Sequence, residues 1–239
     1  MNQDYLDQLK DLPVMPEVAA KVMNVTEGRL ELSFKELESI IKMDTGLTTK
    51  ILKIANSALY ARQREIKSLQ VAITMLGFKN IRSLVLLITA SRLFPRMQKS
   101  SFHAEYWRHS VLSAFMCRIF AIRCGRSDVA EEAFIAGLLH DIGKAALYNA
   151  APAQYAEALE AEKAGVQLLE VIEEQRFGVN HRALGGQLLT RWNFPSLYAD
   201  AAFEHDSLNI NSAHKSLIIL VTVACLTAER VDGKPLSPP

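Results

Sequence analysis

The sequence contains little of what a disulfide framework, a zinc knuckle or a nucleic-acid-binding surface requires. Its 239 residues include only three cysteines, Cys117, Cys124 and Cys225, and no two of them have CxxC spacing. A sparse, odd set of thiols is typical of a reducing compartment, so we expect a cytoplasmic protein. The 27 basic residues balance 26 acidic ones, and a formal net charge of +1 provides no field that would attract nucleic acid.

Long hydrophobic runs are also missing. The longest ones, 84–90 and 217–228, fall short of the roughly 20 residues that span a bilayer. The residues after Met1 lack the basic and apolar regions of a signal peptide. Hydrophobic residues nevertheless make up 49% of the chain, which is enough to bury a core. The composition therefore indicates a soluble globular protein with no membrane partner.

Helix signals recur along the chain, whereas the alternation typical of strands does not. Ser33 to Glu36 reads as a capping box, Asp44 as an N-cap, and Gly125 as the stop after a helix over 104–124. Asn56 suits a helix end, where its side chain can bond the backbone; a partner contact is the alternative reading. Because every predicted element is helical, the expected fold is an all-α multi-helix bundle.

The helical pattern is weakest over 94–102, which separates a half without histidine from a half that holds all six. We expect one domain over residues 1–239 with two helical subdomains, 12–94 and 102–230, although one continuous bundle also fits. The proline-rich residues 231–239 are expected to form a loose tail.

Histidines and carboxylates in the second half have the spacing of a metal site. Glu105 and His109 are four residues apart and share a helix face, and His140 is followed directly by Asp141. Imidazole and carboxylate ligands suit Fe, Mn, Zn or Ni, and a bundle can take such ligands from separate helices. The alternative for His109 is a satisfied core histidine, and for Glu105 a solvated surface charge.

The segment Leu138-Leu139-His140-Asp141-Ile142-Gly143-Lys144 is more specific. Gly143 allows a neighbouring helix or a ligand to approach closely, at a cost in helix propensity. Lys144 is a candidate phosphate-binding residue, because its ammonium group acts as a point charge. The structural alternative is an ion pair on the helix surface between Asp141 and Lys144, which are three residues apart.

At this segment the chain resembles the HD superfamily of metal-dependent phosphohydrolases, and as a whole it resembles the HDOD branch of that superfamily. The stretches that carry the resemblance are LPVMP at 12–16, the ANS-containing segment 44–60, the segment 68–77, HRALG at 181–185 and RWNFP at 191–195. The resemblance extends from about residue 12 to residue 229. It implies an all-helical fold, a bacterial origin and a regulatory role beside other signalling modules.

The resemblance also implies the residues of the site. The metal-ligand candidates are Glu105, His109, His140, Asp141, His181 and His205, with Lys144 facing phosphate. Enzymatic relatives, including the HD-GYP cyclic dinucleotide phosphodiesterases, have a further Asp on a late helix, where this chain has Cys225. Asp206 stands where the HD-GYP pattern has a second histidine. A thiolate would favour softer ions, and the alternative is that Cys225 is a small buried hydrophobe.

Two functions follow from this resemblance. The first is a non-catalytic bacterial signal-transduction domain with a degenerate metal site, which binds another signalling protein or a small ligand. The second is a metal-dependent phosphohydrolase that acts on a nucleotide or a cyclic dinucleotide. The missing late Asp favours the first hypothesis. Neither hypothesis predicts an oligomeric state.

Overall fold

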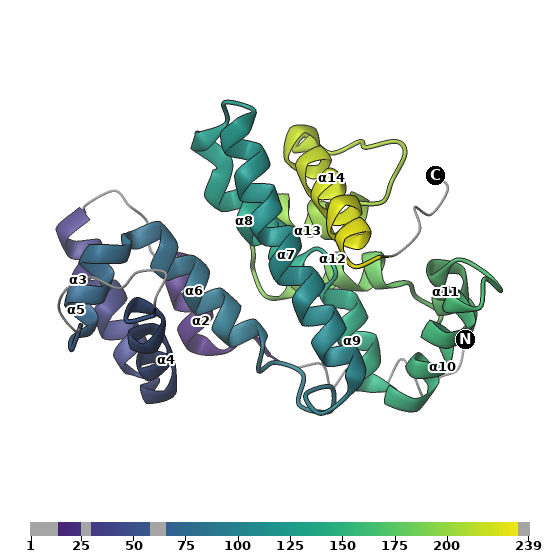
Figure 1. The fold of residues 1–239 in the computed structure, drawn as a ribbon, viewed down its shortest axis with the longest axis horizontal. Helices are drawn as coiled ribbons and strands as arrows, with labels where there is room; N and C mark the ends of the chain where they lie inside the picture. Colours follow the sequence, from purple (N-terminus) through teal and green to yellow (C-terminus); the bar gives the residue numbers. More distant parts are fainter. Residues whose placement is uncertain (1–13, 25–29, 58–65, 234–239) are drawn as a thin grey trace. The chain divides into compact units, whose positions relative to one another are not determined.

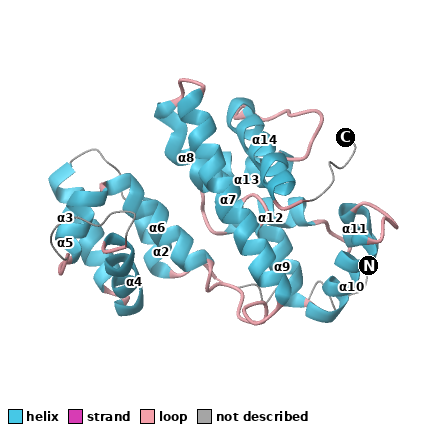
Figure 2. Ribbon diagram, viewed as in Figure 1, coloured by secondary structure: helices cyan, strands magenta, loops and turns pink. Residues whose placement is uncertain are grey.

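The computed structural model describes residues 14–24, 30–57 and 66–233, and all regular secondary structure in these ranges is helical (Figures 1 and 2). The predicted all-α class is therefore confirmed. The chain divides into two compact units, one formed by residues 15–93 and one that contains residues 94–233. Within the described ranges, no single helix combines the length and the hydropathy that crossing a membrane requires. Helices α5 (Leu69–Leu76) and α6 (Phe78–Ala90) meet both criteria only when taken together, and the chain bends by 114° between them.

The first unit contains α2 (Glu17–Asn24), α3 (Leu30–Lys42), α4 (Thr45–Ala55), α5 (Leu69–Leu76) and α6 (Phe78–Ala90). Its core is formed by aliphatic side chains such as Ile41, Leu47, Ile51 and Ile81, each at most 1% exposed. Asp44 Oδ1 accepts a hydrogen bond of 2.8 Å from the backbone N–H of Leu47, so the predicted N-cap is confirmed.

One predicted helix start in this unit is wrong. The capping box at Ser33 lies inside α3, which begins at Leu30. The reason is the intrinsic propensity of Leu30, Glu31 and Leu32, all good helix formers, which extend the helix by a turn before the box.

Asn56 ends α4 and connects the helix to a residue ten positions later. Its side chain accepts from the N–H of Ile66 at 2.8 Å and donates to the carbonyl oxygen of Ile66 at 2.8 Å. It also donates to the carbonyl oxygen of Leu52 at 2.9 Å. The structural role predicted for Asn56 is thereby confirmed.

The second unit carries the remaining helices. They are α7 (Ser101–Arg123), a short 3-10 turn (Ser127–Val129), α8 (Ala130–Leu139), α9 (Ile142–Ala150), α10 (Pro152–Lys163), α11 (Leu169–Phe177), α12 (His181–Arg191), α13 (Ser196–Glu204) and α14 (Lys215–Val231). Helix α7 packs against α8 and α14, and α12 packs against α9 and α13 (Figure 1).

The helical path breaks between α8 and α9. His140 ends α8, and Asp141, with φ −99° and ψ 14°, precedes the first residue of α9. Two residues later, a Cβ atom on Gly143 would lie 1.9 Å from the carbonyl oxygen of His181. The close helix approach predicted for Gly143 is therefore confirmed, and it brings the α8–α9 junction against the start of α12.

Candidate metal centre

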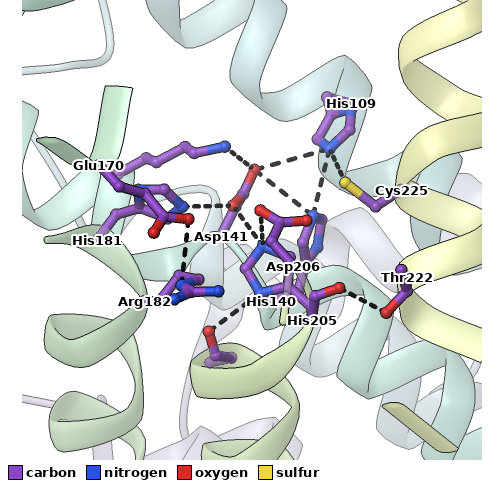
Figure 3. A network of polar contacts seen from close by, with 12 residues as sticks. His109, His140, Asp141, Glu170, His181, Arg182, His205, Asp206, Thr222 and Cys225 are labelled. Atoms are coloured by element: carbon purple, nitrogen blue, oxygen red, sulfur yellow. Dashed lines mark hydrogen bonds and ion pairs between the residues drawn. The ribbon is translucent and has the colours of Figure 1, made fainter. Parts of the chain in front are cut away.

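Four histidines surround Asp141 (Figure 3). His109 lies on α7, His140 at the end of α8, His181 at the start of α12 and His205 at the end of α13. Asp141 Oδ2 lies 3.6 Å from His109 Nε2 and 3.5 Å from His140 Nε2. Asp141 Oδ1 lies 3.4 Å from His205 Nε2 and 3.8 Å from His181 Nε2. Each carboxylate oxygen therefore faces its own pair of imidazoles.

The carboxylate of Asp141 is buried, with 2% of the residue exposed, so its charge requires compensation. Lys144 Nζ donates to Asp141 Oδ2 at 2.9 Å. Burial alone would raise the pKa of Asp141, but Lys144 and the neighbouring histidines hold this pKa well below its usual range. The predicted pair of Asp141 and Lys144 forms, although it is a largely buried interaction rather than a surface one.

Backbone carbonyls fix the orientation of two imidazoles. His140 Nδ1–H donates to the carbonyl oxygen of Gly137 at 2.8 Å, and His205 Nδ1–H donates to that of Ala202 at 3.0 Å. Because a carbonyl oxygen only accepts, Nδ1 carries a proton in both rings and Nε2 is directed at Asp141. Burial lowers the pKa of His140 to about 4, so its Nε2 offers a lone pair at neutral pH.

His205 differs from His140 in its charge. Burial lowers the pKa of His205, but Asp206 and Asp141 raise it further, to about 10. Asp206 Oδ2 lies 3.2 Å from His205 Nε2. In the absence of a metal ion His205 is thus an imidazolium at neutral pH and balances the charge of these carboxylates.

Glu173 orients the third imidazole, and the sequence analysis did not identify this residue. Its Oε2 accepts from His181 Nδ1–H at 2.6 Å and from the backbone N–H of His181 at 2.8 Å. Its Oε1 accepts from the Tyr155 hydroxyl at 2.6 Å. A carboxylate on the outer nitrogen of a histidine is the usual support of a metal-binding imidazole. The available signal was its register, since Leu169, Glu173 and Phe177 lie four residues apart on one buried face of α11.

Glu105 does not join the cluster. Its side chain is 63% exposed, and its Oε2 lies 4.0 Å from Lys163 Nζ. Glu105 precedes His109 by four residues, slightly more than one helical turn, so it lies nearer the start of α7 than the cluster does. At that level of the helix the buried residue is Tyr106. Glu105 is therefore a surface charge and not one of the donors around Asp141.

Cys225 reaches the cluster from α14. It is 3% exposed, and its Sγ lies 3.6 Å from His109 Nε2. His109 Nε2 in turn lies 3.2 Å from His140 Nε2. Burial raises the pKa of the Cys225 thiol well above its ordinary value, so the group is a thiol when no cation is beside it.

The donor atoms fit a divalent metal ion. Within the described residues, Asp141 Oδ1, His181 Nε2 and His205 Nε2 are buried and make no hydrogen bond of regular geometry. Buried polar atoms of this kind need a partner, and imidazole nitrogens with carboxylate oxygens are common metal ligands. In the part of the chain that the structure describes, three groups each have all their donor atoms within 4.8 Å of one another: His109, His140 and Cys225; His140, Asp141 and His205; and His181, His205 and Asp206.

Comparison with known proteins identifies the family that this chain matches and several proteins of similar fold. The family model of the HDOD domain matches residues 12–208. An HDOD domain protein of unknown function from Geobacter sulfurreducens is 21% identical and superposes with a TM-score of 0.83, covering 99% of this chain and 79% of that one. A candidate metal-dependent phosphohydrolase from Shewanella amazonensis is 24% identical with a TM-score of 0.61, covering 98% of this chain and 89% of that one.

Two further similarities concern signalling and chain length. The MmoQ response regulator of Methylococcus capsulatus is 31% identical with a TM-score of 0.52, covering 96% of this chain and 91% of that one. An uncharacterized protein of Treponema pallidum is 22% identical over 229 residues, which are 95% of this chain. The chain spans 44% of the length of this curated relative.

Proposed function

Because this chain belongs to the HDOD domain family, we propose that it is a non-catalytic output domain of bacterial signal transduction. It acts in the cytoplasm by binding another signalling protein, and its buried centre holds a divalent metal ion in a structural or sensory role. The similarity to a response regulator supports a place in signalling.

The observation that carries this proposal is the closure of the centre. His109, His140, Asp141, His181, His205 and Cys225 are each at most 7% exposed. Structural metal sites are closed by protein ligands, whereas catalytic sites keep a coordination position open for water or substrate. A metal ion at this position would supply bonds between α7, α12, α13, α14 and the α8–α9 junction, so its binding would stabilise their arrangement.

The outer faces of two of these helices suit a protein partner. Exposed apolar side chains recur at i, i+4 and i+7 on both α7 and α14. They are Phe115, Ile119 and Ile122 on α7 and Ile219, Val223 and Leu226 on α14, between 36% and 51% exposed. Since α7 also carries His109 and α14 carries Cys225, a change at the centre would act on both helices that carry these exposed side chains.

A phosphohydrolase is the second candidate, and one observation favours it. The side chains of Lys144 and Asp206, at the edge of the buried donors, are 19% and 36% exposed, so solvent reaches this edge although the six donors themselves are buried. A metal ion bound there would polarise a phosphoryl oxygen and lower the pKa of a bound water molecule. Lys144 would then neutralise charge that develops on the phosphoryl group.

Assays of the metal-loaded full chain distinguish the two functions. The chain is reconstituted with Mn(II) or Fe(II), its bound metal is measured, and it is incubated with cyclic dinucleotides and nucleoside triphosphates. We expect bound metal, and hydrolysis no faster than that of the double variant His140→Ala/Asp141→Ala. Glu105→Gln, outside the cluster, is the control. Hydrolysis that the double variant abolishes and the control retains would overturn the non-catalytic role.

A further inference from the structure

The two sides of the Asp141 carboxylate have different chemistry. Beside Oδ1 lie His181 and His205, and Asp206 Oδ2 contacts His205 Nε2 at 3.2 Å. These donors are nitrogen and oxygen. Beside Oδ2 lie His109 and His140, and Cys225 Sγ contacts His109 Nε2 at 3.6 Å. One half of the cluster thus contains a sulfur donor and the other half does not.

The distances in the sulfur-containing half match the edges of a tetrahedron around zinc. With Zn–N of about 2.05 Å and Zn–S of about 2.3 Å, tetrahedral geometry places two nitrogens about 3.3 Å apart and a nitrogen and a sulfur about 3.6 Å apart. His109 Nε2 and His140 Nε2 are 3.2 Å apart, and Cys225 Sγ is 3.6 Å from His109 Nε2.

Asp141 Oδ2 completes the comparison. The same geometry places a nitrogen and a carboxylate oxygen about 3.4 Å apart. Asp141 Oδ2 lies 3.5 Å from His140 Nε2 and 3.6 Å from His109 Nε2. Four edges of the tetrahedron, those that join His109 Nε2 to the other three donors and His140 Nε2 to Asp141 Oδ2, therefore already have the lengths expected around zinc. Cys225 Sγ also lies within 4.8 Å of a ring nitrogen of His140.

We propose that Cys225 is a metal ligand, and that His109, His140 and Cys225 form a zinc-selective position of the centre. The inference rests on the proposed metal centre, and it specifies which metal ion the sulfur-containing half of that centre binds. Binding transfers the thiol proton of Cys225 to solvent and forms a zinc–thiolate bond. One thiolate and the Asp141 carboxylate neutralise the charge of the divalent ion, which suits a buried site. The soft sulfur donor selects Zn(II) over Mn(II) and Mg(II).

A second buried cysteine provides a matched control. Cys117 lies on α7, is 0% exposed, and directs its Sγ to the backbone carbonyl oxygen of Leu220 at 3.8 Å. Cys117→Ser and Cys225→Ser each replace one buried sulfur with oxygen, but only the second acts on the imidazole pair. Cys225→Asp keeps an anionic donor at the position and replaces sulfur with the harder oxygen.

The test uses Co(II) as a spectroscopic substitute for Zn(II) in the metal-free full chain. We expect a thiolate-to-cobalt charge-transfer band in the wild-type and Cys117→Ser proteins and none in Cys225→Ser. Calorimetric titration with Zn(II) should show binding at least about tenfold weaker in Cys225→Ser, since ligand-supporting groups alone are worth 10–100-fold. Cys225→Asp should bind Mn(II) relatively better than the wild type does.

Two results would overturn the inference, and only the second would also overturn the metal centre of the proposed function. If Co(II) binds the wild-type chain without a charge-transfer band, Cys225 is not a ligand, while the metal centre of the proposed function remains. If neither Co(II), Zn(II) nor Mn(II) binds the folded wild-type chain, the metal centre itself is wrong. Circular dichroism of each metal-free variant confirms that the variants compared are folded.

Discussion

His181 Nδ1 lies 2.6 Å from Glu173 Oε2, so the imidazole that faces Asp141 is held from behind by a second carboxylate. Glu173 is 0% exposed, and its other oxygen accepts from the Tyr155 hydroxyl. The orientation of His181 is therefore set before any ligand reaches its Nε2 atom.

Replacing Glu173 with Gln should weaken metal binding without removing a ligand. The amide cannot supply a charged acceptor to the His181 ring, and it adds a donor among buried groups. We expect metal affinity to fall by about 10–100-fold and the free energy of unfolding to fall by about 1–3 kcal/mol. Calorimetric titration and urea unfolding measure the two effects. Glu162→Gln changes an exposed glutamate of α10 in the same way and should leave both quantities unchanged.

A methyl group at Gly143 should destabilise the second unit. The added Cβ of Gly143→Ala would lie 1.9 Å from the backbone oxygen of His181, so α9 and α12 would have to separate. We expect a loss of about 3 kcal/mol or more, at the upper end of overpacking. Gly186→Ala is the comparison, because its Cβ would lie 3.3 Å from the nearest atom, the carbonyl oxygen of Ala199. Equal urea midpoints for the two variants would contradict the close packing of α9 on α12.

Metal binding should become tighter as the pH rises. The pKa of His205 is about 10 in the metal-free protein, because Asp206 and Asp141 raise it against the effect of burial. A metal ion needs the neutral Nε2 atom, so binding must release this proton. The apparent affinity should therefore rise with pH, by up to about tenfold per unit for this proton. Titrations at pH 6.5 and 8.5, in buffers of different ionisation enthalpy, measure the affinity and the protons released; a flat profile contradicts the assignment.

The same pKa predicts the opposite trend for the stability of the metal-free chain. A raised folded-state pKa contributes stability that is fully present below the unfolded pKa of 6.5 and is lost as the pH rises through about 10. The metal-free wild type should therefore lose stability over this range. Asp206→Asn removes one cause of the raised pKa and should lose less. Urea unfolding in the presence of a chelator at pH 7, 8 and 9 makes the comparison.

The first unit should depend on one amide side chain. Asn56→Ala removes three hydrogen bonds, two to the backbone of Ile66 and one to the carbonyl oxygen of Leu52, each worth about 0.5–1.5 kcal/mol. Asn56→Asp keeps the acceptor for the Ile66 N–H group but turns a carboxylate oxygen towards the carbonyl oxygens of Ile66 and Leu52 at the C-terminal end of α4, so it should be less stable than Asn56→Ala. Unfolding curves of the three proteins test this order, and an aspartate variant more stable than the alanine variant would contradict it.

The sequence allowed the helical class and most cluster residues to be predicted, for different reasons. Helix class follows from local signals such as Asp44, whose cap depends on residues three positions away. His109, His140, Asp141, His181 and His205 were found through their resemblance to a family pattern. Their convergence depends on the packing of α7, α9, α12 and α13, which spacing along the chain does not encode.

The positions of two carboxylates could not be predicted from the sequence. Glu105 shares an approximate helix face with His109, yet one further turn of α7 leaves it at the surface beside Lys163. Glu173 is eight residues from His181 and belongs to another helix, so only its place between Leu169 and Phe177 pointed to burial. Local periodicity predicts which face of a helix a residue occupies, but it does not predict which other helix packs against that face.

The donors around Asp141 are distributed from α7 to α14, so the cluster is complete only when α14 is in place. A chain growing on the ribosome exposes His109 and Asp141 long before Cys225 is made. Capture of an ion by the complete set of proposed ligands would thus be a late event in biosynthesis. A nascent chain that stalls before α14 would lack Cys225 and would expose the surfaces of α7 and α8 that α14 covers. The cellular machinery that recognises incompletely folded proteins would then encounter these surfaces.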